Sequence, residues 1–158
     1  MRPPQKTNVM RILDSLGIRY DTASYAVDDD HVDAVTAAEE MGVNPEVVWK
    51  TLVAHDEHNA PLVFVIPSSA ELNVKKAARV VGAKKIELVN LRDLLPLTGY
   101  VRGGCSPIGM KKSYPTWLDE TAALFPRIYV NAGARGLQVI VAPDDLIHAA
   151  NAQFADLT

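Results

Sequence analysis

Apolar residues recur along the chain at two spacings, and these spacings predict the order of its helices and strands. Between Thr7 and Gly17 the spacing is three to four residues, which predicts a helix over residues 7–16 with Thr7 as its cap. The same spacing predicts further helices over residues 36–41, 70–81, 91–95 and 116–124, and from residue 143 onward.

Runs of β-branched and aliphatic residues predict the strands. Two hairpins and two isolated extended segments are expected: residues 47–55 with 62–66, residues 128–131 with 137–141, residues 18–27, and residues 86–89. Residues 28–30 are expected to form an acidic loop. Because strands and helices intermingle without regular alternation, the predicted class is α+β, with a mixed, largely antiparallel sheet flanked by helices.

The composition is that of an ordinary globular protein. A chain of 158 residues with 48% hydrophobic and 22% charged residues can bury a core without a metal or a disulfide. We therefore expect one domain over residues 1–158, with residues 1–6 as a flexible tail. The polar, proline-containing start lacks the apolar stretch of a signal peptide, and no run approaches the ~20 apolar residues of a membrane span. A cytoplasmic protein that contacts no membrane is expected.

Charge is distributed unevenly along the chain. The net charge is −3, but the stretch from Lys75 to Lys112 carries +7 and the remainder −10. This split would allow a positive face that attracts a polyanion, with Lys75, Lys76, Lys111 and Lys112 as candidate contacts. Alternatively, these lysines only solubilise helix faces.

The segment from Gly103 to Gly109 is the most informative loop. It holds three glycines and a proline in seven positions, and glycines let a backbone approach a ligand closely. The spacing fits neither a Walker loop nor a dinucleotide fingerprint. The loop is therefore either a backbone-lined site or an ordinary turn.

Lys50 interrupts an apolar run that extends from residue 47 to residue 53. If the strand is central, its ammonium needs a phosphate, carbonyl or carboxylate partner, because an unpaired buried charge is too costly. If the strand has a solvent face, Lys50 is simply its polar side. Alternation places Lys50 with Val48 and Leu52, so a wholly solvated face is not the simpler interpretation.

Other reactive side chains carry weaker signals. Cys105 is the sole cysteine, so it cannot form an intramolecular disulfide, and no base lies near it in sequence to make it a nucleophile. Its usual role would be that of a small apolar packing residue. No glycine elbow surrounds Ser106, and His55 and His58 sit at a predicted hairpin tip. No metal and no cofactor are expected.

Five ordered segments together resemble the YbaK/EbsC family: residues 49–53, 72–78, 98–112, 129–137 and 142–146. The resemblance covers nearly the whole chain, and the long Gly-Gly-Cys-Ser-Pro-Ile-Gly-Met-Lys-Lys form is most similar to the Cys-tRNA(Pro) deacylase branch. It implies a barrel-like sheet of the type inserted in bacterial prolyl-tRNA synthetases. It also implies a trans-acting deacylase whose partner is a mischarged tRNA 3′ end, with prolyl-tRNA synthetase as a possible second partner and an oligomeric state left open.

The resemblance also implies roles for individual residues. Lys50 matches the family's essential lysine, and the catalytic loop corresponds to Gly103, Gly104, Ser106 and Gly109. The substrate pocket would be lined by Tyr25, Cys105, Pro107, Gln138 and Asp145. Gln138 stands where some relatives have serine, and residues 31–35 depart from an aromatic-glycine pattern, which leaves the amino-acid specificity open.

In the family's proposed mechanism, the thiol of the cysteinyl substrate attacks its own carbonyl, so no protein nucleophile is needed. Two alternatives remain at this stage. One is an enzyme of the same fold that edits Ala-tRNA(Pro) or another small mischarged residue. The other is a non-catalytic module that binds tRNA or a synthetase.

Overall fold

The computed structural model describes residues 6–26 and 34–158, which form two β-sheets and five α-helices within those ranges. The strands are β1 (Asp21–Ser24), β2 (Trp49–His55), β3 (Pro61–Pro67), β4 (Glu87–Leu88), β5 (Thr116–Asp119), β6 (Ile128–Asn131), β7 (Leu137–Val141) and β8 (Ala152–Ala155). The helices are α1 (Asn8–Ser15), α2 (Ala34–Met41), α3 (Val74–Val81), α4 (Leu91–Thr98) and α5 (Pro143–Ala150), with 3₁₀ turns at Pro45–Val47 and Glu120–Leu124.

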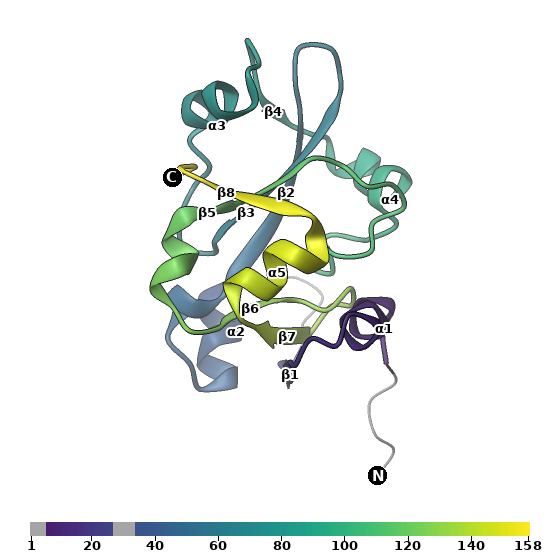
Figure 1. Ribbon diagram of the computed structural model, residues 1–158, viewed down its shortest axis with the longest axis vertical. Coiled ribbons are helices and arrows are strands. Elements are labelled where there is room, and N and C mark those ends of the chain that lie inside the picture. The colour runs from purple at the N-terminus through teal and green to yellow at the C-terminus, as the bar shows by residue number, and fades with distance from the viewer. Residues whose placement is uncertain (1–5, 27–33) are drawn as a thin grey trace.

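The two sheets meet at one end of β2. The larger sheet has the order β4-β2-β3-β5-β8, and the smaller has the order β1-β7-β6 (Figure 1). Strand pairs are antiparallel except β3–β5 and β5–β8, which are parallel. A bridge between Val48 and Tyr129 connects the two sheets. The α+β class with a mixed, largely antiparallel sheet is therefore confirmed.

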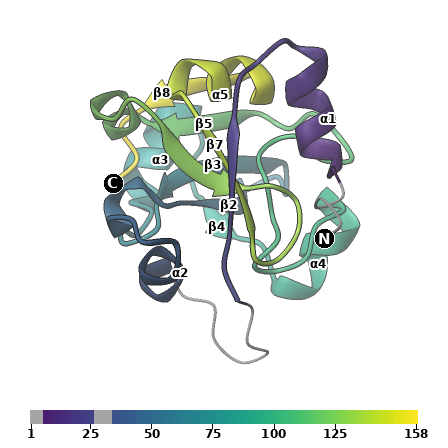
Figure 2. The same cartoon turned by 90° about the horizontal axis from the view of Figure 1, so that it is seen from below.

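The β2–β3 hairpin separates two layers of the core. Phe64 and Leu62 pack on one face with Ala77 of α3, whereas Val63 packs on the other face with Cys105 and residues of α4. This alternation follows from the two-residue period of a strand. A third cluster combines residues of both sheets with residues of α1 and α5. In the view from below, these two helices both lie in the upper part of the molecule (Figure 2).

Several predicted boundaries need correction. Residues 116–124 are not a helix: Thr116–Asp119 is strand β5, and only Glu120–Leu124 forms a 3₁₀ turn. Parallel pairing with β3 overrides the local spacing, and the ring of Trp117 stacks on Phe64 with centroids 5.5 Å apart. Strand β8 was not predicted, because its pairing partner β5 was itself assigned as helix.

Two helix ends also differ from the prediction. Helix α4 does not stop before Pro96 but continues to Thr98, and a left-handed Gly99 ends it. Helix α3 begins only at Val74, where the side chain of Asn73 caps it. Residues 1–5 and the acidic loop at residues 28–30 lie outside the described residues. Within the described part of the chain, no helix has both the length and the apolar character needed to span a membrane.

Candidate active site

A pocket of about 350 Å³ opens where the two sheets separate. Among the described residues, no strand pairs with the outer side of β2 between the Val48 bridge to Tyr129 and Ala54, which pairs with β4. On that side the carbonyl of Val53 accepts a hydrogen bond from the N–H of Val89. The pocket lies along this stretch and is closed by the smaller sheet. Its lining is Tyr25, Ala37, Val48, Trp49, Lys50, Thr51, Ser68, Gly103, Cys105, Asn131 and Gln138.

Lys50 supplies the positive charge of this pocket. It lies on β2 opposite Ile66, and its side chain is half-buried. Burial lowers the pKa of Lys50, although Glu71 opposes this shift through its charge. Among the described residues, no carboxylate reaches salt-bridge distance of its ammonium. The ammonium is therefore available to a polar group of a ligand.

The front of the glycine loop forms another wall. Gly103 and Cys105 line the pocket, and within the described residues neither backbone N–H has a hydrogen-bond acceptor. The N–H of Gly104 is engaged, because it donates to the carbonyl of Val101 at 2.9 Å. Unpaired backbone donors near a pocket can bind a carbonyl oxygen that becomes negative during reaction.

Gly104 has no room for a side chain. A Cβ at that position would lie 3.2 Å from the backbone nitrogen of Arg135 and 3.4 Å from the carbonyl carbon of Ala134. The loop and the turn at residues 133–136 are thus packed backbone to backbone. Absence of a side chain at Gly104 sets how closely the loop approaches the smaller sheet.

Residues 106–109 of the same loop do not line this pocket. Ser106 is fully buried, and its hydroxyl accepts a hydrogen bond from the N–H of Ile108. Pro107 and Gly109 line a different cavity, shared with Lys112 and Tyr114. Four of the predicted loop residues are therefore not among those that line the pocket: Gly104, Ser106, Pro107 and Gly109.

Asn131 on β6 joins the loop to the neighbouring turn. Its Nδ2 donates to the carbonyl of Gly103 at 2.9 Å, and its Oδ1 accepts from the N–H groups of Gly133 at 2.7 Å and Ala134 at 3.1 Å. All of this asparagine's acceptor capacity is thus in use. Sequence reasoning missed Asn131, since its role depends on contacts between residues far apart in the chain.

Gln138 lies on β7, directly opposite Asn131 in the strand register. Only 5% of its surface is exposed. Its Oε1 is the one buried side-chain nitrogen or oxygen atom of the described residues that lacks a hydrogen-bond partner. A pocket-lining amide with an unused acceptor is a candidate contact for a ligand donor.

The thiol of Cys105 is poorly suited to attack a substrate. Burial raises the pKa of Cys105 to about 12, while a hydrogen bond with Thr98 acts weakly in the opposite direction. The thiol is therefore protonated at neutral pH, and the nucleophilic form of cysteine is the thiolate. Among the described residues, no histidine lines the pocket.

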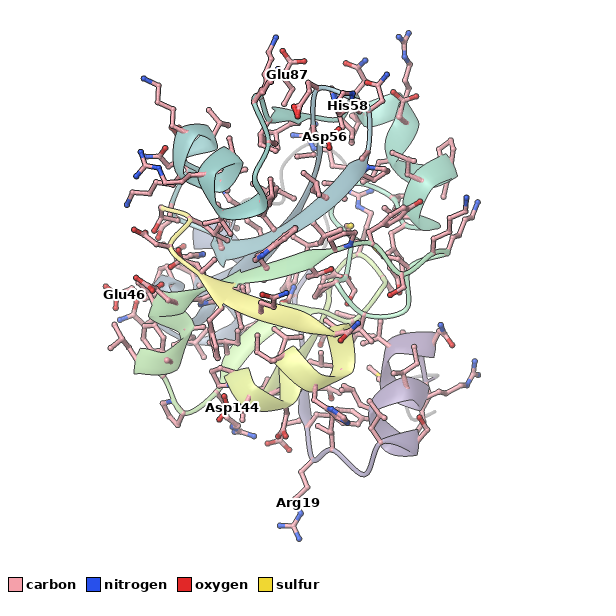
Figure 3. The ribbon with its side chains drawn as sticks, turned by 45° about the horizontal axis from the view of Figure 1, so that its top comes forward. Arg19, Glu46, Asp56, His58, Glu87 and Asp144 are labelled. Atoms are coloured by element: carbon pink, nitrogen blue, oxygen red, sulfur yellow. The ribbon has the colours of Figure 1, made fainter. Side chains whose placement is uncertain are left out.

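The remaining predicted site residues are distributed differently. Tyr25 lines the pocket just after β1, and its N–H donates to the carbonyl of Gly136. Asp145 lies in the first turn of α5 and is not among the lining residues. The neighbouring residue Asp144 is labelled in the lower half of Figure 3.

The histidines noted in the sequence are remote from the pocket. His58 and Asp56 lie at the tip of the β2–β3 hairpin, at the opposite end of the molecule from Asp144 (Figure 3). Among the described residues, no cluster of three or more His, Cys, Asp or Glu side chains could hold a metal ion. Side chains of residues 31–35 lie outside the description.

The four candidate tRNA-binding lysines do not share one face. Lys75 and Lys76 belong to α3, which covers one side of the β2–β3 hairpin, whereas Lys111 and Lys112 follow the glycine loop on the other side. Lys76 is also neutralised by Asp156, 3.0 Å from its ammonium. The single positive face that the charge distribution allowed is therefore divided in two.

Arg135 was not predicted as a site residue but lies beside the pocket wall. A Cβ at Gly103 would stand 3.4 Å from its Nε, so the arginine side chain runs across that glycine. Its guanidinium is exposed and, within the described chain, has no carboxylate partner. The signal available in the sequence was an arginine between two glycines of the predicted turn at residues 133–136.

Comparisons with known proteins agree with this arrangement. The chain is 44% identical over 154 residues to a protein of Enterococcus faecalis named "Putative Cys-tRNA(Pro)/Cys-tRNA(Cys) deacylase EbsC", covering 98% of this chain and 94% of that protein. It is 27% identical over 104 residues to a proline–tRNA ligase of Shouchella clausii, covering 66% of this chain but only 18% of the ligase.

The fold also matches a solved structure titled "Crystal structure of a putative trans-editing enzyme for prolyl tRNA synthetase". The TM-score is 0.80 at 24% identity, covering 98% of this chain and 99% of the other. Residues 29–149 match the family described as the aminoacyl-tRNA editing domain. With this match over most of its length and the extended similarity to the Enterococcus protein, the chain belongs to the aminoacyl-tRNA editing domain family.

Proposed function

We propose that this protein is a trans-acting deacylase that cleaves the aminoacyl ester of mischarged Cys-tRNA(Pro). The observation that carries the proposal is that one pocket holds the Lys50 ammonium and the backbone N–H groups of Gly103 and Cys105, none of which has an ion-pair or hydrogen-bond partner among the described residues. An ester bound between them would have its alcohol side near a cation and its carbonyl near backbone donors. The 44% identical relative named for Cys-tRNA deacylation supports the choice of substrate.

The chemistry needs positioning more than strong acid–base catalysis. An ester has a better leaving group than an amide, so orientation and stabilisation of the oxyanion can supply much of the rate. In our proposal, Lys50 binds the terminal ribose or its phosphate, and the loop N–H groups bind the carbonyl oxygen. Asn131 holds the loop in place through the carbonyl of Gly103.

The nucleophile in this proposal is the substrate's own thiol. Its sulfur attacks the ester carbonyl, the carbonyl carbon–oxygen bond to the ribose breaks, and the thiol proton passes to the departing ribose oxygen. The products are a free tRNA 3′ end and a cyclic thiolactone. The buried, protonated Cys105 is consistent with a reaction that takes its thiol from the substrate.

The partner is the acceptor end of tRNA, and the similarity to a segment of a proline–tRNA ligase supports tRNA(Pro). In our proposal Arg135 binds a phosphate near the pocket wall, because its side chain runs across Gly103 and has no carboxylate partner among the described residues. Prolyl-tRNA synthetase is a second proposed partner, which would hand over the mischarged product.

A deacylation assay on a panel of charged tRNAs tests this function. The panel contains Cys-, Ala-, Ser- and Pro-tRNA(Pro), with Cys-tRNA(Cys) as a test of tRNA selectivity. We expect Cys-tRNA(Pro) to be cleaved at least tenfold faster than the seryl substrate, because a hydroxyl is the weaker nucleophile. A preference for Ala-tRNA(Pro) would indicate an alanine-editing enzyme, and tRNA binding without cleavage would indicate a non-catalytic module.

A further inference from the structure

Among the described residues, the one buried side-chain nitrogen or oxygen atom without a hydrogen-bond partner lies in the wall of the candidate active site. Gln138 Oε1 is shielded from solvent and accepts no hydrogen bond. Buried polar atoms in folded proteins are almost always paired, so an exception in a pocket indicates a partner that binds from outside. This atom is an acceptor, and its missing partner must therefore be a donor.

Among the described residues, none donates a hydrogen bond to this oxygen. Asn131, across the strand pair, donates one N–H of its Nδ2 to the carbonyl of Gly103, and its second N–H forms no hydrogen bond with Gln138 Oε1. On the other side of β7, Gln138 is opposite Ala23, whose side chain has no polar atom. The terminal amide of glutamine can turn about its last torsion at little cost, since its oxygen has no bond to lose. Such a turn can present the oxygen to a ligand.

We propose that Gln138 Oε1 accepts a hydrogen bond from the α-amino group of the bound aminoacyl ester, and that Gln138 thereby makes the site selective for an aminoacyl rather than a plain acyl group. This proposal rests on the deacylase function proposed above. The ester linkage itself carries no donor, and a thiol is only a weak one. An amine is a good donor and is present in every aminoacyl-tRNA.

The charge of the pocket favours the same assignment. Lys50 lies in the same pocket, and its ammonium disfavours a second positive charge nearby. The α-amino group is therefore bound in its neutral form, which still carries N–H donors. A neutral amide oxygen is a suitable acceptor for a neutral amine, whereas a carboxylate there would pair with Lys50.

The test uses stable analogues in which an amide replaces the ester at the 3′ carbon of adenosine. One analogue carries cysteine, one carries 3-mercaptopropionate, which lacks the α-amino group, and one carries alanine, which lacks the thiol. Binding is measured by calorimetry to the wild type and to Gln138→Met, which keeps the side-chain length but removes the acceptor. Gln153→Met is the matched control, because Gln153 is exposed on β8.

We expect the wild type to bind the cysteine analogue about ten- to thirtyfold more tightly than the mercaptopropionate analogue. Gln138→Met should remove this difference by weakening only the two analogues with an α-amino group. Gln153→Met should behave as wild type. A separate circular dichroism melt confirms that each variant is folded.

Three outcomes would overturn the assignment. Equal weakening of all three analogues by Gln138→Met would indicate a purely structural role. A loss confined to the two thiol-containing analogues would mean that Gln138 contacts the thiol instead. Failure of the wild type to bind any analogue would reject the contact outright. Deacylation of Cys-tRNA(Pro) by the wild type is measured in a separate assay. If the analogues bind in a Gln138-dependent way but no deacylation occurs, the proposed reaction is rejected and the Gln138 contact is retained.

Discussion

The end of β5 and the wall of the pocket each bury a polar side chain, but only the first is satisfied. The carboxylate of Asp119 is fully buried and accepts from the N–H of Leu157 at 2.9 Å, the hydroxyl of Thr158 at 3.4 Å, and both the N–H and the hydroxyl of Thr121. Gln138 is buried almost as completely, yet its Oε1 has no partner.

The difference separates a structural role from a binding role. Asp119 ties the C-terminal residues to β5, so its hydrogen bonds contribute to the fold. Gln138 and Lys50 leave polar groups unpaired in one place, which costs stability unless a ligand supplies the partners. Substitutions around Asp119 should therefore change stability, whereas substitutions around the pocket should change activity.

The largest effect is expected at Lys50. Lys50→Ala should lower kcat/KM for Cys-tRNA(Pro) at least a hundredfold, because it removes the charge that positions the substrate. Lys50→Arg should also fail in large part, since a planar guanidinium does not replace a compact ammonium. Melting temperatures should stay close to that of the wild type, because Lys50 forms no ion pair with any described residue. Lys84→Ala, an exposed lysine, is the control, and near wild-type activity in Lys50→Ala would contradict the assignment.

Asp119→Ala, in contrast to Lys50→Ala, should lower the stability of the protein and leave its activity nearly unchanged. It leaves the N–H of Leu157 buried without an acceptor, so the free energy of unfolding should fall by about 3 kcal/mol in urea titrations. At a temperature where the variant is folded, its kcat/KM should remain within about twofold of the wild type. Glu120→Ala, at the exposed neighbouring position, should change neither quantity. A large loss of activity in folded Asp119→Ala would remove the distinction between the two regions.

Two glycines of one loop offer a matched pair. Gly104→Ala pushes a Cβ to 3.2 Å from the Arg135 nitrogen, which should displace the loop and lower kcat/KM about tenfold. Gly109→Ala places a Cβ 2.9 Å from the Cδ1 of Ile12 at a φ of +75°, so it should cost about 2 kcal/mol of stability. Assays below both melting temperatures should find Gly109→Ala active. Equal activity losses in both variants would mean that the whole loop serves the pocket.

The sequence pattern correctly predicted the elements that depend on interactions between residues close together in the chain. The β2–β3 hairpin and the cap of Thr7 on α1 follow from short-range patterns, and both are confirmed. Strand β5 could not be found, because its state depends on parallel pairing with β3, about fifty residues earlier in the chain. Lys50 stood out as an isolated charge in an apolar run. The importance of Asn131 became visible only when the fold brought it to Gly103.

Substitution of the candidate tRNA-binding lysines should have a smaller effect, on the salt dependence of tRNA affinity, and this effect should differ between the two pairs. Lys111 and Lys112 follow the loop that reaches the pocket, whereas Lys76 is already paired with Asp156. Changing both Lys111 and Lys112 to Gln should reduce the slope of log affinity for tRNA against log salt by about one to two. Changing Lys75 and Lys76 to Gln should leave the slope nearly unchanged. The opposite result would place the tRNA on the α3 side of the hairpin.

The smallest effect is expected at Cys105, although it lines the pocket. Cys105→Ala should keep kcat/KM for Cys-tRNA(Pro) within about tenfold of the wild type, roughly 1.4 kcal/mol of barrier, since the thiol contributes volume rather than chemistry. Burial raises the pKa of Cys105 to about 12, so native protein at pH 8 should react with iodoacetamide far more slowly than unfolded protein.

The raised pKa of Cys105 also determines how the free energy of unfolding changes with pH. The pKa of Cys105 in the folded state lies above the ordinary thiol value of 9.0, so the stabilisation by the buried neutral thiol is full below pH 9 and declines as the pH rises toward 12. Unfolding free energies measured between pH 8 and pH 11 should therefore fall more steeply for the wild type than for Cys105→Ala. Complete loss of deacylation in Cys105→Ala, together with a trapped acyl-enzyme in the wild type, would make Cys105 the nucleophile and overturn the substrate-thiol mechanism.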